Sequence, residues 1–177
     1  MKRRKRLTFV HKGNILKITD GIFKQAVHDM AEGFRDVELE DLHIDIATAQ
    51  LIKRPESFDV IVTTNLFGDI LSDEAAQVVG GLGVAAGANI GDHYGMFEPV
   101  HGSAPKYTGQ NKVNPIATIE AVRMMLEYLG EKKVADKVGK ATLRVLEEGK
   151  VLTYDLGGSA KTSDVGKAIA EKVSQMN

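Results

Sequence analysis

The residues best suited to chemistry in this sequence are two aspartates in the segment Gly68-Asp-Ile-Leu-Ser-Asp73. The segment follows an unbroken β-branched run, residues 59–64, which is typical of a strand covered on both faces of a sheet. Residues four apart share one face of a helix, so Asp69 and Asp73 would present both carboxylates together. Such a pair favours a bound cation, and hard oxygen ligands favour Mg²⁺ or Mn²⁺ over zinc. The alternative is a solvated acidic helix start stabilised by the helix dipole, and spacing alone leaves it open.

Three further polar residues stand beside short apolar runs. Lys12 and Asn14 directly follow the run 7–10, and Asp45 follows another apolar run and opens a helix. A lysine beside a bound cation loses proton affinity and can act as a general base, whereas most lysines at strand ends face solvent. An aspartate that opens a helix is most often an N-cap. The residues alone leave both interpretations open.

A third candidate is the segment Glu98-Pro-Val-His-Gly-Ser-Ala-Pro105, which contains one histidine and is rich in glycine and proline. A backbone of this kind can wrap closely around a planar or phosphate-bearing ligand. The segment is neither a GxGxxG fingerprint nor a Walker loop, so the pattern by itself is equally compatible with a simple connection.

The elements that must position these residues alternate between strands and helices, which indicates an α/β protein. Extended segments are expected at residues 7–10, 37–46, 59–64 and 151–155. Helices are expected at residues 15–34, 45–53, 65–79, 115–129, 132–146 and 163–173. Pro55 ends the second of these helices, and the glycines from Gly80 end the third. The strands are fewer than a complete doubly wound domain uses, so the sequence resembles the second half of a larger fold.

Composition excludes several classes of protein. The chain has 177 residues, 43% hydrophobic and 27% charged, with a formal net charge of −1 and no cysteine. These values are typical of a globular cytoplasmic protein without disulfides or thiolate metal sites. No apolar run approaches the ~18 residues of a membrane span. The basic run 2–6 is either a nucleic-acid patch or, as we favour, an exposed helix end that leads into a buried strand.

Read together, these stretches resemble the isocitrate/3-isopropylmalate dehydrogenase family of metal-dependent β-decarboxylating dehydrogenases, specifically its C-terminal portion. The matching motifs occur in the order and spacing of the family across almost the whole chain. They are His11-Lys-Gly-Asn14, Asp45 with Lys53-Arg-Pro55, residues 65–74, Gly80-Gly-Leu-Gly83, residues 87–91, residues 97–105, Asn114-Pro115 and Tyr154-Asp-Leu-Gly-Gly158.

The resemblance implies an isopropylmalate dehydrogenase-like three-layer α/β fold, present here only as its C-terminal half. Residues 1–80 would be the later part of the small dimer-forming domain, and residues 81–177 the returning part of the large cofactor-binding domain. A homodimer would form through the helices at 15–34 and 66–79. The substrate-gripping arginines, the substrate-selecting helix and the proton-donor tyrosine of the family's earlier half have no counterpart here. We therefore expect a missing N-terminal half and an isolated chain that is inactive.

The implied activity is oxidative decarboxylation of a 2-hydroxy-3-carboxy acid (isocitrate, homoisocitrate or 3-isopropylmalate), with hydride transfer to NAD(P). Asp45, Asp69 and Asp73 match the residues that hold Mg²⁺ or Mn²⁺ and the substrate. Lys12 matches the lysine that assists proton removal, and both Lys12 and Asp45 would act in the site of the partner subunit. The alternative is a non-catalytic dimerisation module or an inactive truncated fragment.

The resemblance also assigns cofactor contacts. Asn14 matches a contact on the nicotinamide side. The residues expected around the adenosine half are Glu98, His101, Gly102, Ser103, Ala104 and Asn114. Lys106, Tyr107 and Tyr154 suit a 2′-phosphate, which favours NADP. Gly158 stands where NADP-dependent relatives place an arginine, so NAD stays open.

Overall fold

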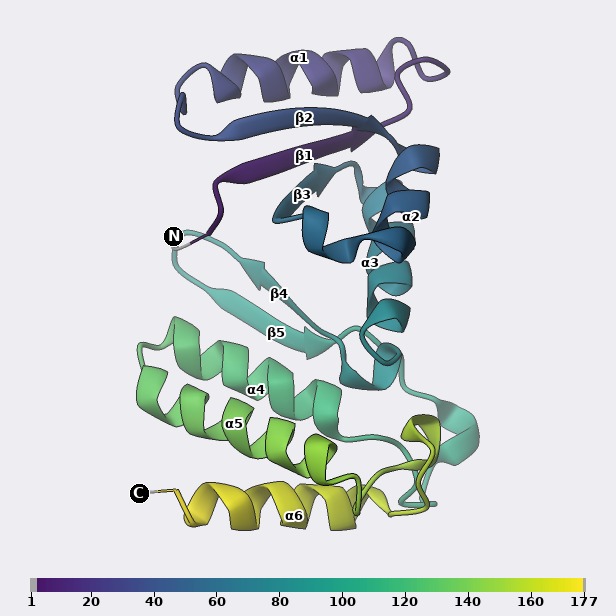
Figure 1. Cartoon of the computed structure of the whole chain (residues 1–177), viewed down its shortest axis with the longest axis vertical. Coiled ribbons are helices and arrows are strands. Elements are labelled where there is room, and N and C mark those ends of the chain that lie inside the picture. The colour runs from purple at the N-terminus through teal and green to yellow at the C-terminus, as the bar shows by residue number, and fades with distance from the viewer. Residues whose placement is uncertain (1–2, 177) are drawn as a thin grey trace. The chain divides into compact units, whose positions relative to one another are not determined.

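The computed structural model describes residues 3–176. The chain divides into two compact units, Met1–Val78 and Val79–Asn177. Figure 1 shows the first unit as a small sheet with helices, and the second as a hairpin followed by three helices. The expected α/β class is confirmed.

A parallel three-stranded sheet organises the first unit. Its strands are β1 (Arg6–His11), β2 (Glu38–His43) and β3 (Val60–Thr63), in the order β2-β1-β3. The central strand pairs on both sides, with Leu7 opposite Leu39 and Val60. Phe9 and Val10 are consequently fully buried, whereas Val60 on the outer strand is 39% exposed. The burial expected for β3 is therefore only partial: none of its residues is fully buried, although Ile61 packs against the cluster that contains Ala47 and Leu71.

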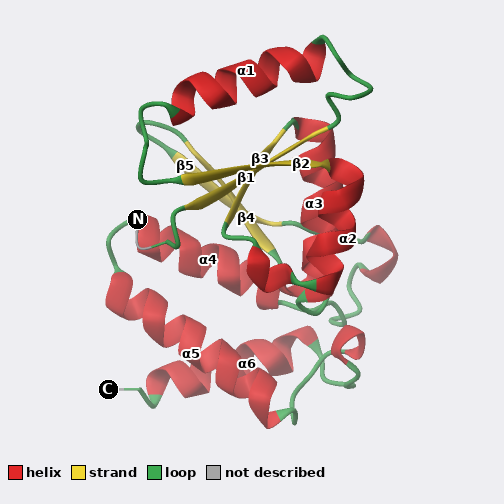
Figure 2. Ribbon diagram, turned by 45° about the horizontal axis from the view of Figure 1, so that its top comes forward, coloured by secondary structure: helices red, strands yellow, loops and turns green. Residues whose placement is uncertain are grey.

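Helices cover the two faces of this sheet, which makes three layers. Helix α1 (Thr19–Ala31) lies on one face, and α2 (Ile44–Lys53) and α3 (Asn65–Val78) lie on the other (Figures 1 and 2). Side chains alternate along a strand, so neighbouring residues of β1 serve different layers. Phe9 meets Phe23 of α1 edge to face at 5.2 Å. Val10 packs into a cluster with Ala47 and Leu71 of the opposite layer.

The connection from β1 leads to β2 on one side, and the connection from β2 leads back past β1 to β3 on the other side. Because all three strands are parallel, their carboxyl ends meet at one edge. The segments that leave this edge are residues 12–14, 44–45 and 64–65. This is the edge at which open α/β sheets bind ligands.

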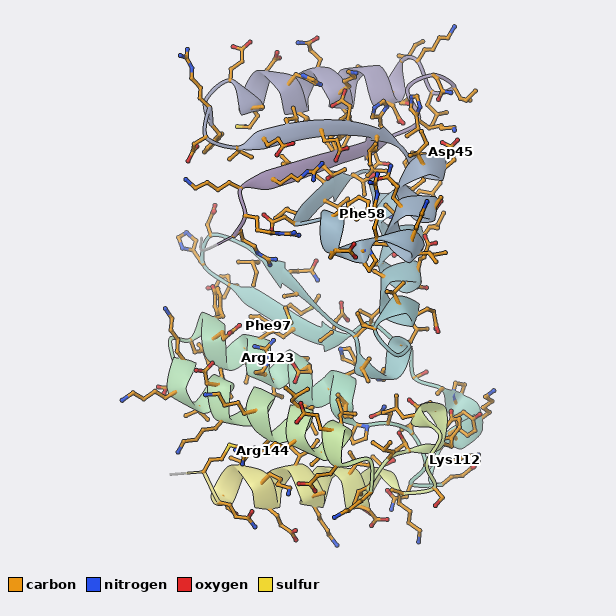
Figure 3. All side chains as sticks on the ribbon, viewed as in Figure 1. Asp45, Phe58, Phe97, Lys112, Arg123 and Arg144 are labelled. Carbon is orange, nitrogen blue, oxygen red and sulfur yellow. The ribbon has the colours of Figure 1, made fainter. Side chains whose placement is uncertain are left out.

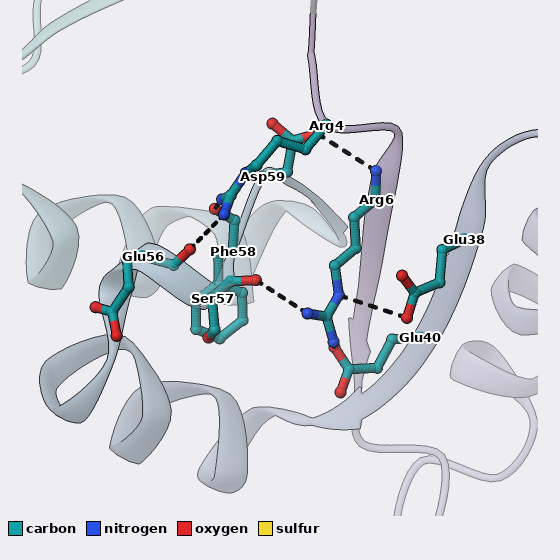
Figure 4. Close-up of polar contacts among 8 residues, drawn as sticks. All are labelled: Arg4, Arg6, Glu38, Glu40, Glu56, Ser57, Phe58 and Asp59. Atoms are coloured by element: carbon teal, nitrogen blue, oxygen red, sulfur yellow. Dashed lines mark hydrogen bonds and ion pairs between the residues drawn. The ribbon is translucent and has the colours of Figure 1, made fainter.

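The basic N-terminal run is tied to its own unit (Figure 4). The Arg4 guanidinium donates to the carbonyls of Glu56 and Phe58. Arg6 donates from Nη2 to Glu40 at 2.9 Å, and its backbone N–H donates to Asp59 at 3.3 Å. These residues lead directly into β1 and form no helix, so the expected helix end is wrong for residues 3–6. The rest of the basic run lies outside the described residues.

The second unit begins with an antiparallel hairpin. Strands β4 (Ala86–Ile90) and β5 (Gly95–Pro99) pair from Ala86–Pro99 to Ile90–Gly95. Helices α4 (Ile116–Tyr128), α5 (Lys132–Glu148) and α6 (Thr162–Ser174) follow. Phe97 of β5 packs against Tyr128 of α4 at 5.6 Å. The core of this unit consists of Ile116, Ala141, Val145, Val165 and Ile169.

Most expected elements are confirmed, with three exceptions. The first helix begins only at Thr19, so Ile15 and Ile18 precede it in a turn. The hairpin lies in a glycine-rich stretch for which no strand was expected. The extended segment expected at 151–155 is absent, and a short 3-10 turn, η4 (Tyr154–Leu156), stands there. Among the described helices, none has the length and apolar character needed to cross a membrane.

Candidate active site

Lys12 and Asp45 meet at the carboxyl edge of the sheet. The Lys12 ammonium donates to Oδ1 of Asp45 at 2.5 Å, and the lysine side chain is 24% exposed. This hydrogen bond from Lys12 lowers the pKa of the Asp45 carboxyl. His43 is the N-cap of α2, and Asp45 lies within its first turn, as Figure 3 shows. The N-cap alternative for Asp45 is therefore wrong, because His43 occupies that position. Lys12 is paired at the surface, and its role as a general base stays a prediction.

The backbone around Lys12 is held by two buried polar side chains. The carboxylate of Asp20, 3% exposed, accepts the backbone N–H of Lys12 at 2.6 Å. Nδ1 of His11 accepts the backbone N–H of Gly13 at 3.0 Å. Burial lowers the pKa of His11, and its ring stacks on Phe9 at 4.8 Å. The turn that carries Lys12 is therefore fixed from both sides.

The two aspartates of α3 are exposed, one helical turn apart. Within residues 3–176, neither carboxylate has an ion-pair or hydrogen-bond partner. The Ser72 hydroxyl donates to the backbone carbonyl of Asp69 and not to its carboxylate. Their oxygen chemistry and lack of partners fit a hard divalent cation. The described residues contain no group of three or more His, Asp or Glu side chains placed to hold a metal. Within one chain, therefore, Asp69 and Asp73 share a helix, and Asp45 does not join them in a three-residue metal site.

The glycine- and proline-rich segment is partly strand and partly loop. Glu98 is exposed within β5, so the expected loop starts two residues later than predicted. Nδ1 of His101 lies 2.9 Å from the carbonyl of Gly102, which can only accept, so Nδ1 carries the proton. Nε2 of the same ring is buried without a partner among the described residues.

Ala104 adopts a conformation that is rare for a residue with a side chain. Its φ of 44° and ψ of 58° are left-handed, directly before the 3-10 turn η3 (Pro105–Tyr107). Backbone strain of this kind persists only where the surroundings enforce it and is frequent in ligand-binding loops. Ser103 and Gly102 beside it are exposed. The loop thus combines a strained residue, an unpartnered ring nitrogen and open backbone.

Asn114 is 6% exposed and already has partners on both ends of its amide. Its Nδ2 donates to Asp155 at 2.9 Å, and its Oδ1 accepts the backbone N–H of Ile116 at 2.9 Å. A methyl group on Gly83 would lie 2.6 Å from Asp155, so that glycine makes room for the pair. Asn114 therefore joins η4 to the start of α4, and its contact with a cofactor stays a prediction.

Two tyrosines and two lysines gather between η3 and η4. The rings of Tyr107 and Tyr154 lie 5.8 Å apart between centroids. Lys106 lies over the ring of Tyr107 at 4.9 Å, and Lys112 lies over the ring of Tyr154 at 4.7 Å. The Tyr154 hydroxyl and the Lys106 ammonium lower the pKa of Tyr107. The three residues expected at a 2′-phosphate are thus together, in company with Lys112.

Sequence reasoning missed three residues that shape these sites: Asp20, His11 and Lys112. His11 stands inside the motif His11-Lys-Gly-Asn14, and Asp20 is an acid in the first turn of a helix, which was an available signal. Lys112 had no such signal, because a lysine in a polar loop is ordinarily a solvated surface residue. Asn14 is exposed in the turn after β1, and its nicotinamide contact stays a prediction.

The sequence and the fold are similar to those of known dehydrogenases. The family model described as isocitrate/isopropylmalate dehydrogenase matches residues 1–169. A 3-isopropylmalate/3-methylmalate dehydrogenase of Methanocaldococcus jannaschii is 51% identical over 168 residues, which are 95% of this chain and 50% of that protein. An isocitrate/homoisocitrate dehydrogenase of Thermus thermophilus is 50% identical over 173 residues, covering 98% of this chain and 52% of that protein. The crystal structure of isocitrate dehydrogenase from Methylococcus capsulatus matches with a TM-score of 0.92 at 46% identity, over 96% of this chain and 51% of that one.

These matches define a class of decarboxylating dehydrogenases. The chain belongs to the isocitrate/isopropylmalate dehydrogenase family. It spans about half the length of the curated relatives that it matches. The predicted family and its isopropylmalate dehydrogenase-like fold are confirmed, and the extent of the matches agrees with the expected C-terminal portion.

Proposed function

We propose that this chain supplies the metal- and proton-handling residues, together with a cofactor-binding loop, of an enzyme that oxidatively decarboxylates a 2-hydroxy-3-carboxy acid. Isocitrate, homoisocitrate and 3-isopropylmalate are the candidate substrates, and NADP is favoured over NAD as the hydride acceptor. The single observation that carries the proposal is the unpartnered carboxylate pair of Asp69 and Asp73 on α3, the helix that leaves the carboxyl edge of the sheet.

The metal in this proposal is Mg²⁺ or Mn²⁺. Asp69 and Asp73 of one protomer would hold it, and Asp45 of a second protomer would complete the site. A bound divalent ion supplies Lewis-acid polarisation of the substrate hydroxyl and carboxylate. The exposure of all three carboxylates leaves them accessible to a second protomer.

Lys12 is the proton carrier in this proposal. The Lys12 ammonium donates to Asp45 in the pair, and it would have to lose a proton to solvent, as a nearby divalent cation favours, before Nζ could accept the proton of the substrate hydroxyl. Asp20 and His11 fix the backbone on either side of Lys12, so separation would move the side chain and leave the turn in place. A general base of this kind must reach the substrate hydroxyl within hydrogen-bond distance.

The nucleotide-binding part of the proposal concerns the second unit. His101 belongs to this proposal through Nε2, which has no partner among the described residues. The exposed backbone at Gly102 and Ser103 allows a close approach. Lys106, Tyr107 and Tyr154 offer a cation and two phenols to a phosphate, which supports NADP.

Dimerisation through α1 and α3 belongs to the same proposal. The apolar side chains of and around these helices are exposed in the single chain. Their exposed fractions are 68% for Ile15, 78% for Ile18, 69% for Ile22, 66% for Leu66, 50% for Ile70 and 71% for Val79. Exposed apolar side chains on each helix support association with a second copy. The same surface also favours the second candidate, a dimerisation module without catalysis.

Binding of Mn²⁺ separates the two candidates. We would titrate Mn²⁺ into the chain and follow the free ion by electron paramagnetic resonance, with sedimentation to confirm the dimer. Asp69→Asn and Asp73→Asn should each weaken binding roughly tenfold or more. Asp29→Asn, an exposed aspartate of α1, is the matched control and should bind as the parent does. Equal binding in all four proteins, with dimerisation intact, would favour the non-catalytic module.

Activity is tested by supplying the remaining half. The chain would be mixed or co-expressed with the N-terminal half of the M. jannaschii relative, and NADPH formation would be followed with each candidate acid. We expect turnover only in the presence of both halves and Mn²⁺, and none with Asp69→Asn. Absence of turnover with every acid, in a complex shown to have assembled, would count against the enzymatic proposal.

A further inference from the structure

Lys112 occupies a special place in the tyrosine–lysine cluster of the second unit. It projects from the loop between η3 and α4 (Figure 3), with Nζ 4.7 Å from the ring centroid of Tyr154 and 5.2 Å from that of Tyr107. Lys112 is thus the cation that faces both rings, whereas Lys106 faces Tyr107. A ring face attracts an ammonium but leaves N–H donors available to a further ligand.

The two ammonium groups of this cluster lack a neutralising carboxylate. Within the part of the chain that the structure describes, no ion pair involves Lys106 or Lys112. The carboxylate next to Tyr154 is Asp155, which accepts the amide of Asn114 at 2.9 Å. Two unneutralised cations around a pair of phenols favour an anion with several oxygens.

The backbone at position 158 leaves no room for a cationic side chain in this cluster. A Cβ atom on Gly158 would lie 2.0 Å from the carbonyl oxygen of Leu152 and 2.6 Å from its carbonyl carbon. No side chain, charged or neutral, fits there without moving the backbone. Gly158 and Tyr154 line one hollow, and Tyr107 and Ser103 line its neighbour. Lys112 borders both hollows, so its charge reaches the place that a residue at 158 cannot serve.

We propose that Lys112 is a specificity-determining residue for the phosphate ester on the ribose 2′-oxygen of an adenine nucleotide, acting together with Lys106 across the two tyrosines. This inference rests on the NADP-linked function proposed above. Such a phosphate carries about two negative charges at neutral pH. Lys112 and Lys106 approach it from the two rings, and the phenols donate hydrogen bonds. A ribose without this phosphate gains nothing from Lys112, so the residue discriminates between the two nucleotides.

The test compares small nucleotides on the full chain by isothermal titration calorimetry. The probes are adenosine 2′,5′-bisphosphate, adenosine 3′,5′-bisphosphate and 5′-AMP. The parent should bind the 2′,5′-bisphosphate most tightly. Lys112→Ala should weaken that binding about tenfold or more and leave 5′-AMP unchanged, because one charged hydrogen bond is lost. Lys112→Arg should retain the preference, and Lys133→Ala, an exposed lysine of α5, should behave as the parent does.

Each outcome distinguishes this inference from the function on which it rests. A parent that prefers the 2′,5′-bisphosphate, with Lys112→Ala equally selective, overturns the role of Lys112 and leaves the NADP proposal standing. Equal loss of all three nucleotides in Lys112→Ala, with a lowered melting temperature, assigns Lys112 to loop stability and overturns the inference. A parent that binds all three equally overturns both the inference and the preference for NADP. A parent that binds none also overturns the cofactor proposal.

Discussion

Lys12 and Asp45 form their ion pair because the register of two parallel strands aligns the residues that follow them. His11 at the end of β1 is paired with His43 at the end of β2. Lys12 follows His11 directly and Asp45 lies two residues after His43, so both leave the same end of the sheet, and Nζ of Lys12 reaches Oδ1 of Asp45 at 2.5 Å. One strand register thus brings the Lys12 ammonium and the Asp45 carboxylate together.

The acid titration of Asp45 should reveal this pair. We expect its carboxyl pKa, measured by carbon-13 NMR, to lie below the usual value of about 3.9 and to rise in Lys12→Met. Because the folded pKa is depressed, the pair stabilises the protein above the unfolded pKa and is lost as pH falls through the folded one. Lys53→Met, in the last turn of α2, is the control. An unchanged Asp45 titration in Lys12→Met would show that the pair does not persist in solution.

His11 should make stability depend on pH in a higher range. Burial lowers its pKa below 6.5; Asp41 opposes this shift, and Lys24 and His43 add to it. A lowered histidine pKa gives stability that is present above pH 6.5 and lost as pH falls through the folded pKa. His11→Asn keeps an acceptor for Gly13 but does not titrate. Its melting temperature should therefore fall less between pH 7 and pH 5 than that of the parent, and parallel curves would contradict this assignment.

Asp20→Ala should destabilise the first unit and loosen the turn that carries Lys12. The substitution leaves the backbone N–H of Lys12 without its acceptor, which costs about 1–3 kcal/mol. Urea unfolding would measure the loss, and the amide signals of residues 12–14 would report the turn. Asp29→Ala on the exposed side of α1 is the matched control, and we expect a change within about 0.5 kcal/mol. An equal loss of unfolding free energy in both variants would show that Asp20 does not hold the turn at Lys12.

Two glycines of the second unit should respond to alanine in opposite directions. Gly158→Ala places a methyl group 2.0 Å from a backbone oxygen, so the loop must move and the melting temperature should fall. Gly166 lies inside α6, and a methyl group there meets nothing within 4 Å. Gly166→Ala should stabilise the protein by about 0.5–1 kcal/mol through helix propensity. Thermal unfolding of both variants checks the pair, and a stabilised Gly158→Ala would be incompatible with the close backbone approach.

Local patterns predicted the elements where one force dominated. Pro55 ends α2 at Lys53 because proline cannot continue a helix, and apolar periodicity located α4, α5 and α6. The hairpin of β4 and β5 was missed because glycine and alanine have weak strand propensity, and their pairing depends on packing against α4. The composition of β3 predicted cover on both faces, whereas the structure leaves all of its residues at least partly exposed.

The candidate sites were predictable in their residues more than in their contacts. The motif residues Lys12, Asp45, Asp69 and Asp73 were identified, but the ion pair between the first two depends on strand order, which the sequence does not state. Asn114 was expected to contact cofactor, yet its amide holds Asp155 at a sequence distance of 41 residues. The position of Lys112 over the rings of Tyr107 and Tyr154 could not be predicted, because it depends on the tertiary structure that brings the two rings together.

The close packing of Gly158 against Leu152 sets a practical limit for engineering this protein. A mutagenesis library that varies position 158 to switch cofactor preference would return glycine among its folded members, whatever charge the selection demands. Positions 106 and 112 are exposed above the tyrosine rings, so substitutions there should change ligand binding and leave the fold intact. Any redesign that needs a cation at 158 must first lengthen or reroute the segment 152–158.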